Sequence, residues 1–162
     1  MPNNYHLLIP DVKYIEPIKD PEHLCRIHYP AAFYDSKIPS ESVVNHLLLY
    51  KYGTSVKARR DHLKVRHDIH RMGPIVMDER CQFVMFPLSV SKNKNPFWLN
   101  LCSMLQFSRS GIASLPTRIH FNDMTTIDIE ADFKFCEKQY DKTLRVLDRS
   151  IKIKEQPIYI TV

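Results

Sequence analysis

Residues 51–71 read KYGTSVKARRDHLKVRHDIHR, and this basic segment is the most unusual part of the chain. It contains seven Lys and Arg residues but only two acidic residues, so its net charge is +5 with neutral histidines. The whole chain of 162 residues also carries +5, which means that the charges outside the basic segment cancel. A local excess of this kind indicates a polyanionic partner, although a basic run can also be an ordinary solvated face.

The cations of the basic segment recur at helical spacing. Intervals of three, four, three and four residues separate Lys57, Arg60, Lys64, His67 and Arg71. On a helix these intervals place the side chains on one face, where like charges repel one another. Because this repulsion is unfavourable without a counter-charge, the pattern favours nucleic acid as the partner.

The apolar residues of the same segment follow a strand-like spacing, which overlaps the helical spacing of the cations. Leu63, Val65 and Ile69 alternate with polar residues, as in a strand. We therefore predict a short helix over 55–63, followed by an extended run into the turn at Gly73-Pro74. In that arrangement the cations belong to two elements, which form one patch only if they pack side by side.

Two further segments have helical patterns. The first begins at Ser40, the predicted N-cap, and ends at Gly53, which suits a left-handed C-terminal position. The second covers 133–150, with Asp132 as its expected cap. We expect their apolar stripes to face the core; these stripes comprise Val43, Val44, Leu47 and Leu48 in the first, and Cys136, Tyr140, Leu144, Leu147 and Ile151 in the second.

Most of the remaining chain has the pattern of short strands. Residues 30–39 are predicted to be a connection, and 97–107 suits either a strand or a helical turn. Asn122-Asp123 is the expected tight turn of a hairpin, and the tail after 150 is a candidate edge strand. The strands are expected within 5–29, at 74–78, 82–88 and 117–121, and at 126–131. We therefore expect an α+β fold, mostly an antiparallel sheet with two main helices, in a single domain over 1–162.

Composition narrows the classes of function. Three isolated glycines cannot form a Gly-rich nucleotide-binding loop, and four separated cysteines contain no CxxC metal motif. The cysteines are expected to be small core residues in a reducing cytoplasm. No leader pattern and no apolar run of membrane-spanning length is present in the sequence. We expect no cofactor, no metal and no catalytic residue.

Two alternatives to DNA binding remain open at this point. His67, Asp68 and His70 could supply ligands to a metal-dependent nuclease, although their spacing is generic. An RNA-binding module would also suit a basic chain. Phe97 and Trp98 could stack on bases, but large aromatic residues are more often buried in the core.

The order of features in the central third resembles the ComK family of competence transcription factors. A Tyr-Gly pair precedes the basic segment, a His precedes a Pro-Ile strand, an apolar strand ends in Phe-Pro, and a polar loop leads to Trp-Leu. These are Tyr52-Gly53, His70, Pro74-Ile75, Phe86-Pro87 and Trp98-Leu99. The hairpin and the following helix extend the likeness over roughly residues 5–150.

The resemblance implies an activator of competence genes that binds paired AT-rich boxes as an oligomer and reaches the minor groove. Lys57, Arg59 and Arg60 match the basic stretch of the family best, and the other contacts are inferred from charge. The expected partner is double-stranded, AT-rich DNA, with the protein in the cytoplasm at the nucleoid. The expected DNA-binding residues are Lys57, Arg59, Arg60, Lys64, Arg66, His67, Arg71, Lys92, Lys94 and Arg109.

One feature of the family is not carried over. Its better-known members have a longer C-terminal tail that an adaptor protein recognises for regulated proteolysis. The present sequence ends at Val162 after IKIKEQPIYITV. We therefore leave adaptor-driven degradation out of the expectations for this chain.

Overall fold

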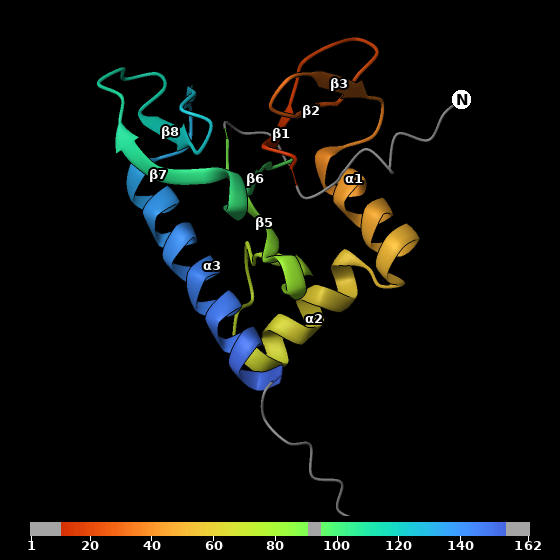
Figure 1. Cartoon of the computed structure of the whole chain (residues 1–162). Helices are drawn as coiled ribbons and strands as arrows, with labels where there is room; N and C mark the ends of the chain where they lie inside the picture. The colour runs from red at the N-terminus through yellow and green to blue at the C-terminus, as the bar shows by residue number, and fades with distance from the viewer. Residues whose placement is uncertain (1–10, 91–94, 155–162) are drawn as a thin grey trace, which may run out of the picture.

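The structure is a computed structural model that describes residues 11–90 and 95–154. Six strands form an antiparallel sheet in the order β3-β2-β1-β6-β5-β4, and three more form a second antiparallel sheet in the order β7-β8-β9 (Figure 1). The larger sheet comprises β1 (Tyr14–Pro17), β2 (Cys25–His28), β3 (Phe33–Ser36), β4 (Ile75–Asp78), β5 (Phe83–Leu88) and β6 (Phe97–Asn100). The smaller comprises β7 (Met104–Arg109), β8 (Thr117–Phe121) and β9 (Thr126–Ile129).

Three helices pack against these sheets. They are α1 (Ser40–Leu47), α2 (Val56–His67) and α3 (Phe133–Lys154), and a π-helical turn continues α1 from Leu48 to Tyr52. Gly53 ends that turn with φ 65°, as the sequence predicts. The expected α+β class is confirmed, with the two main helices and the additional helix in the basic segment.

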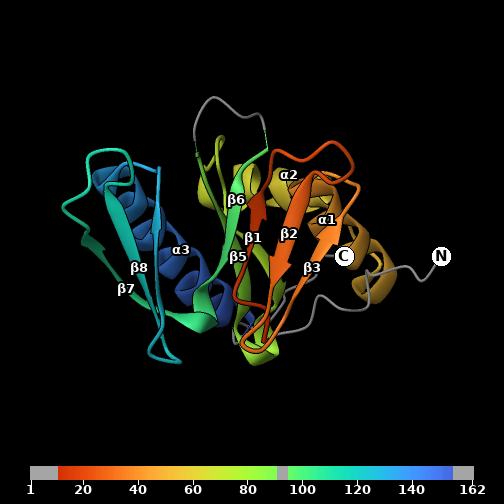
Figure 2. The ribbon, with the colours of Figure 1, turned by 90° about the horizontal axis from the view of Figure 1, so that it is seen from above.

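Successive side chains of a strand point to opposite faces of the sheet, so the core is divided between the two faces of the larger sheet. Ile15, Met85 and Trp98 face α1, where they pack with its apolar stripe. Phe86 and Leu99 face the opposite way, against the smaller sheet and the beginning of α3. The sheet is therefore a central layer, with α1 on one side and the smaller sheet on the other (Figure 2). The prediction that Trp98 is a core residue is confirmed, because its side chain is fully buried.

Several local predictions were wrong. Residues 33–36 form β3 and not a connection, and 151–154 continue α3 instead of forming an edge strand. The expected tail strand beyond 154, and strand residues before 11, lie outside the described residues. The positive φ of the β8–β9 turn belongs to Met124, at 70°, and not to Asn122-Asp123. The ambiguous stretch resolves into strands β6 and β7, joined by a short 3-10 turn.

Side-chain roles also differ from the expectation in three places. Ser40 is not the cap of α1, because its hydroxyl donates to the carbonyl of Pro96, 2.8 Å away. Cys25 and Cys136 are buried as expected, but Cys81 and Cys102 are exposed. The stripe predicted for the last helix is only partly buried. Instead α3 buries two polar residues, Gln139 and Thr143.

The N-terminus of α3 offers a direct test of the assigned cap. The amide of Phe135 donates to Oδ2 of Asp132 at 3.1 Å, as a capping carboxylate should. We expect Asp132→Ala to lower the free energy of unfolding by about 1 kcal/mol. Asp132→Asn keeps an oxygen acceptor and should retain most of that stability. Urea denaturation of both variants measures the difference. Equal losses would show that the charge of Asp132, and not its role as a hydrogen-bond acceptor, stabilises the helix.

Candidate nucleic-acid interface

The basic segment forms a longer helix than its sequence pattern predicts. Ser55 caps α2, its Oγ accepting from the amide of Ala58 at 3.0 Å, and the side-chain oxygen of Asn45 accepts from the amide of Val56 at 2.9 Å. The helix continues through His67 and ends at Asp68, whose φ is 53°. The predicted extended run after residue 63 is wrong for 64–67. Five of the seven Lys and Arg residues of the segment therefore share one helix, with Lys51 before it and Arg71 after it.

On one side of α2, two carboxylates offset most of the charge of three cations. Nζ of Lys57 lies 3.0 Å from Asp61, and Nζ of Lys64 lies 3.9 Å from the same carboxylate. The hydrogen bond from Lys57 lowers the pKa of Asp61. On the neighbouring helix, Glu41 pairs with Arg60. The repulsion that we expected along this stripe is therefore offset by two carboxylates.

The other side of α2 carries the unbalanced charge. Arg66 is exposed and forms no ion pair with any described residue. Arg59 is half-buried, and its Nε has no hydrogen-bond partner among the described residues. His67 is buried between α2 and α3, with only 7% of its surface exposed. Burial, with His62, Arg149 and Arg66 nearby, lowers the pKa of His67.

A second set of cations lies on α3. Residues 133–154 contain seven Lys and Arg residues against three acidic ones, a net charge of +4 that the rest of the chain cancels. Four of these cations recur at intervals of four, three and four residues, which places them on one face of the helix. They are Lys138, Lys142, Arg145 and Arg149. These four cations were not among the residues predicted from the sequence, in which the apolar stripe is the prominent feature of this helix.

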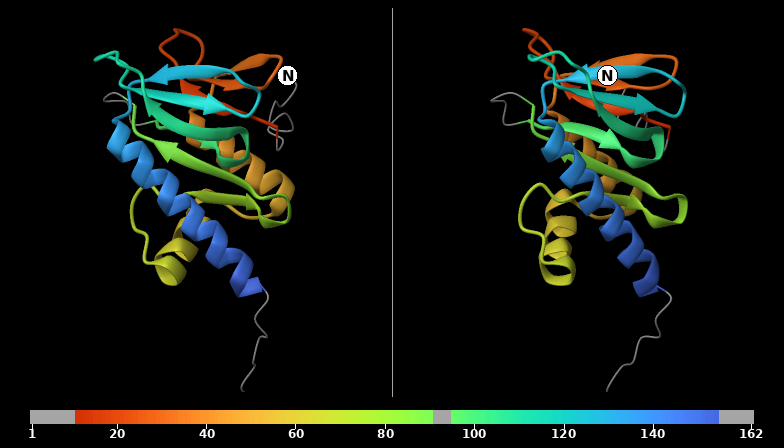
Figure 3. Two further views of the ribbon diagram at one scale, coloured as in Figure 1. Left: turned by 60° about the vertical axis from the view of Figure 1, so that its left-hand side comes forward. Right: turned by 90° about the vertical axis from the view of Figure 1, so that its left-hand side faces the viewer.

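Contacts with α2, the loop after it and β5 hold α3 in place. Leu63 of α2 packs in one cluster with Val146 and Leu147 of α3. Nε2 of Gln139 donates to the carbonyls of Met72 and Pro87, each at 2.8 Å. Nζ of Lys142 donates to the carbonyl of Arg71 at 3.3 Å. The end of α2 and the later turns of α3 therefore lie side by side (Figures 1 and 3).

Cations of both helices and of the loop after α2 lie around this contact. We call this surface the helix junction and define it as Arg66, Arg71, Lys138, Lys142, Arg145 and Arg149. No ion pair links any of the six to a described residue. Five acidic residues are near these cations in sequence and reduce the local potential, namely Asp61, Asp68, Glu137, Asp141 and Asp148.

Other predicted site residues lie elsewhere. The guanidinium of Arg109 stacks on the ring of Phe133, 4.5 Å from its centroid, at the beginning of α3. At 1.5 Å per residue, Phe133 is about 8 Å along the helix axis from Lys138, the nearest member of the helix junction on α3, and about 24 Å from Arg149. The structure therefore places Arg109 beyond the Lys138 end of the helix junction and far from Arg145 and Arg149. Lys92 and Lys94 lie outside the described residues.

The three candidate metal ligands of the nuclease alternative, His67, Asp68 and His70, do not come together in the structure. Nε2 of His70 lies 2.7 Å from Oδ1 of Asp68, and both side chains are well exposed. His67 is buried on the inner side of α2 instead. Among residues 11–90 and 95–154, no three His, Cys, Asp or Glu side chains are placed to hold a metal ion.

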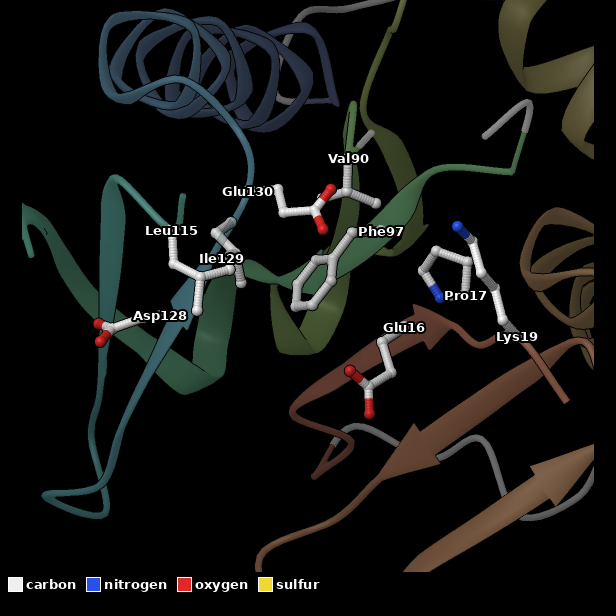
Figure 4. Close-up of a pocket in the computed structure, with 9 residues that line it drawn as sticks. All are labelled: Glu16, Pro17, Lys19, Val90, Phe97, Leu115, Asp128, Ile129 and Glu130. Atoms are coloured by element: carbon white, nitrogen blue, oxygen red, sulfur yellow. The ribbon is translucent and has the colours of Figure 1, made fainter. Parts of the chain in front are cut away.

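A pocket of about 310 Å³ lies between β1, β6 and β9 and has the opposite charge. Figure 4 shows the carboxylates of Glu16 and Glu130 on opposite sides of the Phe97 ring, with Asp128 farther along β9. Two of these acids have partners, since Glu16 contacts His28 and Asp128 contacts Arg118. Carboxylates repel phosphates, so this pocket is unsuited to a nucleic-acid backbone.

No helix of the described residues has the length and apolar character needed to cross a membrane.

No curated protein and no solved structure matches the chain. The sequence model of the family described as ComK protein matches residues 15–155, which is most of the chain. That family is one of transcription factors and not of enzymes, as the resemblance in the central third implies. The chain therefore belongs to the ComK family of competence transcription factors.

Proposed function

We propose that this chain is a DNA-binding activator of competence genes that recognises AT-rich promoter boxes through the minor groove. The observation that carries the proposal is the helix junction, where six cations of α2, the loop after it and α3 have no ion-pair partner among the described residues, in a chain of this family. Phosphate contacts by such cations supply sequence-independent affinity that falls steeply with salt. The proposed site of action is the bacterial cytoplasm, at the nucleoid.

The dimensions of the groove constrain how α2 could dock. An α-helix with its side chains is about 10–12 Å wide, whereas the minor groove of B-DNA is only about 6 Å wide. In the proposed complex α2 therefore lies across the phosphates, and long side chains enter the groove. Runs of A·T pairs narrow the groove and strengthen its negative potential, which attracts arginine and lysine. Arg66 and Arg71 carry exposed guanidinium groups suited to this role.

The two sides of α2 should contribute unequally. We expect Arg66→Ala with Arg71→Ala to reduce the slope of log affinity against log salt by about two units. A guanidinium in the narrow groove lies between two rows of phosphates, and each phosphate charge that it neutralises contributes about 0.9 to the slope. Lys57→Ala with Lys64→Ala removes the same charge but should change the slope by less, since both lysines already have Asp61 as a partner. Fluorescence anisotropy of a labelled AT-rich duplex measures both slopes. Equal reductions would mean that pairing within α2 does not decide which cations meet DNA.

A competition experiment distinguishes the proposed DNA binding from the RNA-binding alternative. We expect unlabelled AT-rich duplex DNA to displace the labelled AT-rich duplex at lower concentration than RNA of equal length. A-form RNA presents a wide, shallow minor groove, where the narrow-groove potential of A·T runs is absent. RNA that competed better than the DNA would favour the RNA-binding module.

Oligomerisation is part of the proposal, because paired boxes require more than one binding unit. Symmetric half-sites in DNA are normally matched by symmetric protein oligomers. Sedimentation equilibrium of the full chain, with and without a two-box duplex, tests this element. A monomer that occupies two boxes independently would contradict it.

A further inference from the structure

A second pocket lies where the end of α2 meets α3, with a volume of about 280 Å³. His67 and Ile69 line one side of it, and α3 lines the other. Figure 3 shows these two segments alongside each other in both views. Four cations of α3 surround the opening, namely Lys138, Lys142, Arg145 and Arg149. The only carboxylate that lines the pocket is that of Asp141, whose side chain is exposed.

His67 is the second observation that points to a ligand. More than nine-tenths of its surface is buried, and neither Nδ1 nor Nε2 has a hydrogen-bond partner among the described residues. Buried polar groups are almost always hydrogen-bonded, so an unpartnered imidazole in the wall of a pocket needs a physical reason. An oxygen atom of a ligand within the pocket would provide the missing acceptor.

We propose that this pocket binds a phosphoryl group, with His67 donating a ring N–H from the buried wall and the cations of α3 contacting the outer oxygens. A phosphate offers several acceptor oxygens and negative charge, which matches donors on opposite sides of one cavity. Guanidinium groups such as those of Arg145 and Arg149 bind phosphate through paired N–H donors. The opposing charge of Asp141 weakens the site but is outnumbered by these cations.

Lys142 is already positioned for this role. Its Nζ donates to Oε1 of Gln139 at 2.7 Å and to the carbonyl of Arg71 at 3.3 Å, which fixes the ammonium group near the pocket. Burial lowers the pKa of Lys142, because the charged form loses hydration. A bound anion would offset that loss, so ligand and lysine stabilise each other in the charged state.

The phosphoryl group could come from the DNA backbone or from a free phosphate. The first source rests on the proposed function, since it requires the helix junction to lie on DNA. In that case the pocket receives a phosphodiester while Arg66 and Arg71 approach the groove. The second source does not require DNA and would make the pocket a small-anion site beside the interface.

Imidazole NMR of the full-length protein distinguishes these possibilities. Protein labelled with ¹⁵N-histidine is titrated with inorganic phosphate, and separately with chloride at matched ionic strength. The His67 signals are assigned by their loss in His67→Gln. We expect these signals to shift with phosphate in a saturable manner and to respond little to chloride.

Substitutions outside the buried wall confirm the location without disturbing the core. Arg145→Gln with Arg149→Gln should weaken phosphate binding by on the order of tenfold or more, since charge-assisted bonds are lost. Lys37→Gln removes an exposed cation directly after β3, a strand that does not line the pocket, and should leave the titration unchanged. An equal effect of Lys37→Gln would assign the shift to general screening and overturn the proposal.

A parallel titration with a short AT-rich duplex identifies the source. Shifts of His67 with the duplex assign the ligand to the DNA backbone, whether or not free phosphate also binds. Shifts with phosphate alone assign it to a free anion, and the pocket then stands even if the chain fails to bind DNA. No shift of His67 with either ligand, under conditions where the protein is folded, overturns the proposal.

Discussion

Replacing Arg145 and Arg149 together with glutamine is expected to weaken binding of an AT-rich duplex by on the order of 100-fold at moderate salt. Both guanidinium groups belong to the helix junction, and neither forms an ion pair with a described residue. Their charge is therefore available to phosphates, each contact contributing about tenfold. The slope of log affinity against log salt should also fall by about two units. Fluorescence anisotropy across a sodium chloride series measures both quantities.

The other end of the same helix supplies a matched control. Arg109→Gln with Lys134→Gln also removes two cations, but Arg109 stacks on Phe133 at the beginning of α3. We expect that pair to change the affinity and slope only slightly, even though Arg109 was among the DNA-binding residues predicted from sequence. Equal losses for the two pairs would show that total charge, and not the helix junction, determines binding.

The largest effect on stability is expected for Gln139→Leu. The substitution removes the donor that Gln139 supplies to the carbonyls of Met72 and Pro87, each 2.8 Å away, while a similar volume is retained. A buried acceptor left without its donor costs about 1–3 kcal/mol. We therefore expect the free energy of unfolding to fall by about 2–5 kcal/mol. Urea denaturation provides the measurement, and the two proteins are compared by their free energies of unfolding, provided that both show the same dependence of that free energy on urea concentration.

A substitution on the outer side of the same helix controls for helix propensity. Leu144 is 40% exposed, and Leu144→Ala should change the free energy of unfolding by about 1 kcal/mol or less. If Gln139→Leu were no more destabilising than Leu144→Ala, the two hydrogen bonds would not be what fixes α3 to β5 and to the loop after α2.

The hairpin and the core were predictable because local patterns determine them. Alternation along 117–121 and 126–129 places Ile119 inside and Arg118 opposite Asp128, and the structure confirms both. β3 was missed because it is a short edge strand whose Phe33 and Tyr34 are exposed, so it has no buried face to mark it. Sequence patterns therefore identify elements with one buried face better than elements without one.

In the basic segment, the cations follow a helical spacing whereas the apolar residues follow a strand-like alternation. Leu63, Val65 and Ile69 suggest a strand, yet Val65 is 88% exposed on α2. Packing of Leu63 against Val146 and Leu147 stabilises the helix instead, and these partners are more than eighty positions away in the chain. No local pattern contains that information.

The candidate interface was only half predictable for a related reason. The basic segment is evident from its own charge, but the cations of α3 are hidden because acidic residues elsewhere cancel them in the total. Glu41 neutralises Arg60 from another helix, which the sequence does not reveal. The location of unpaired charge depends on tertiary contacts, so it emerges only from the structure.

The most direct test of DNA binding at the helix junction is the affinity of the purified full chain for AT-rich and GC-rich duplexes of equal length across a salt series. We predict that the AT-rich duplex binds more tightly at every salt concentration and that both affinities fall steeply as salt rises. Negligible affinity for both duplexes at moderate salt would contradict DNA binding itself. Equal affinities for the two duplexes would contradict recognition of AT-rich sequence through the minor groove.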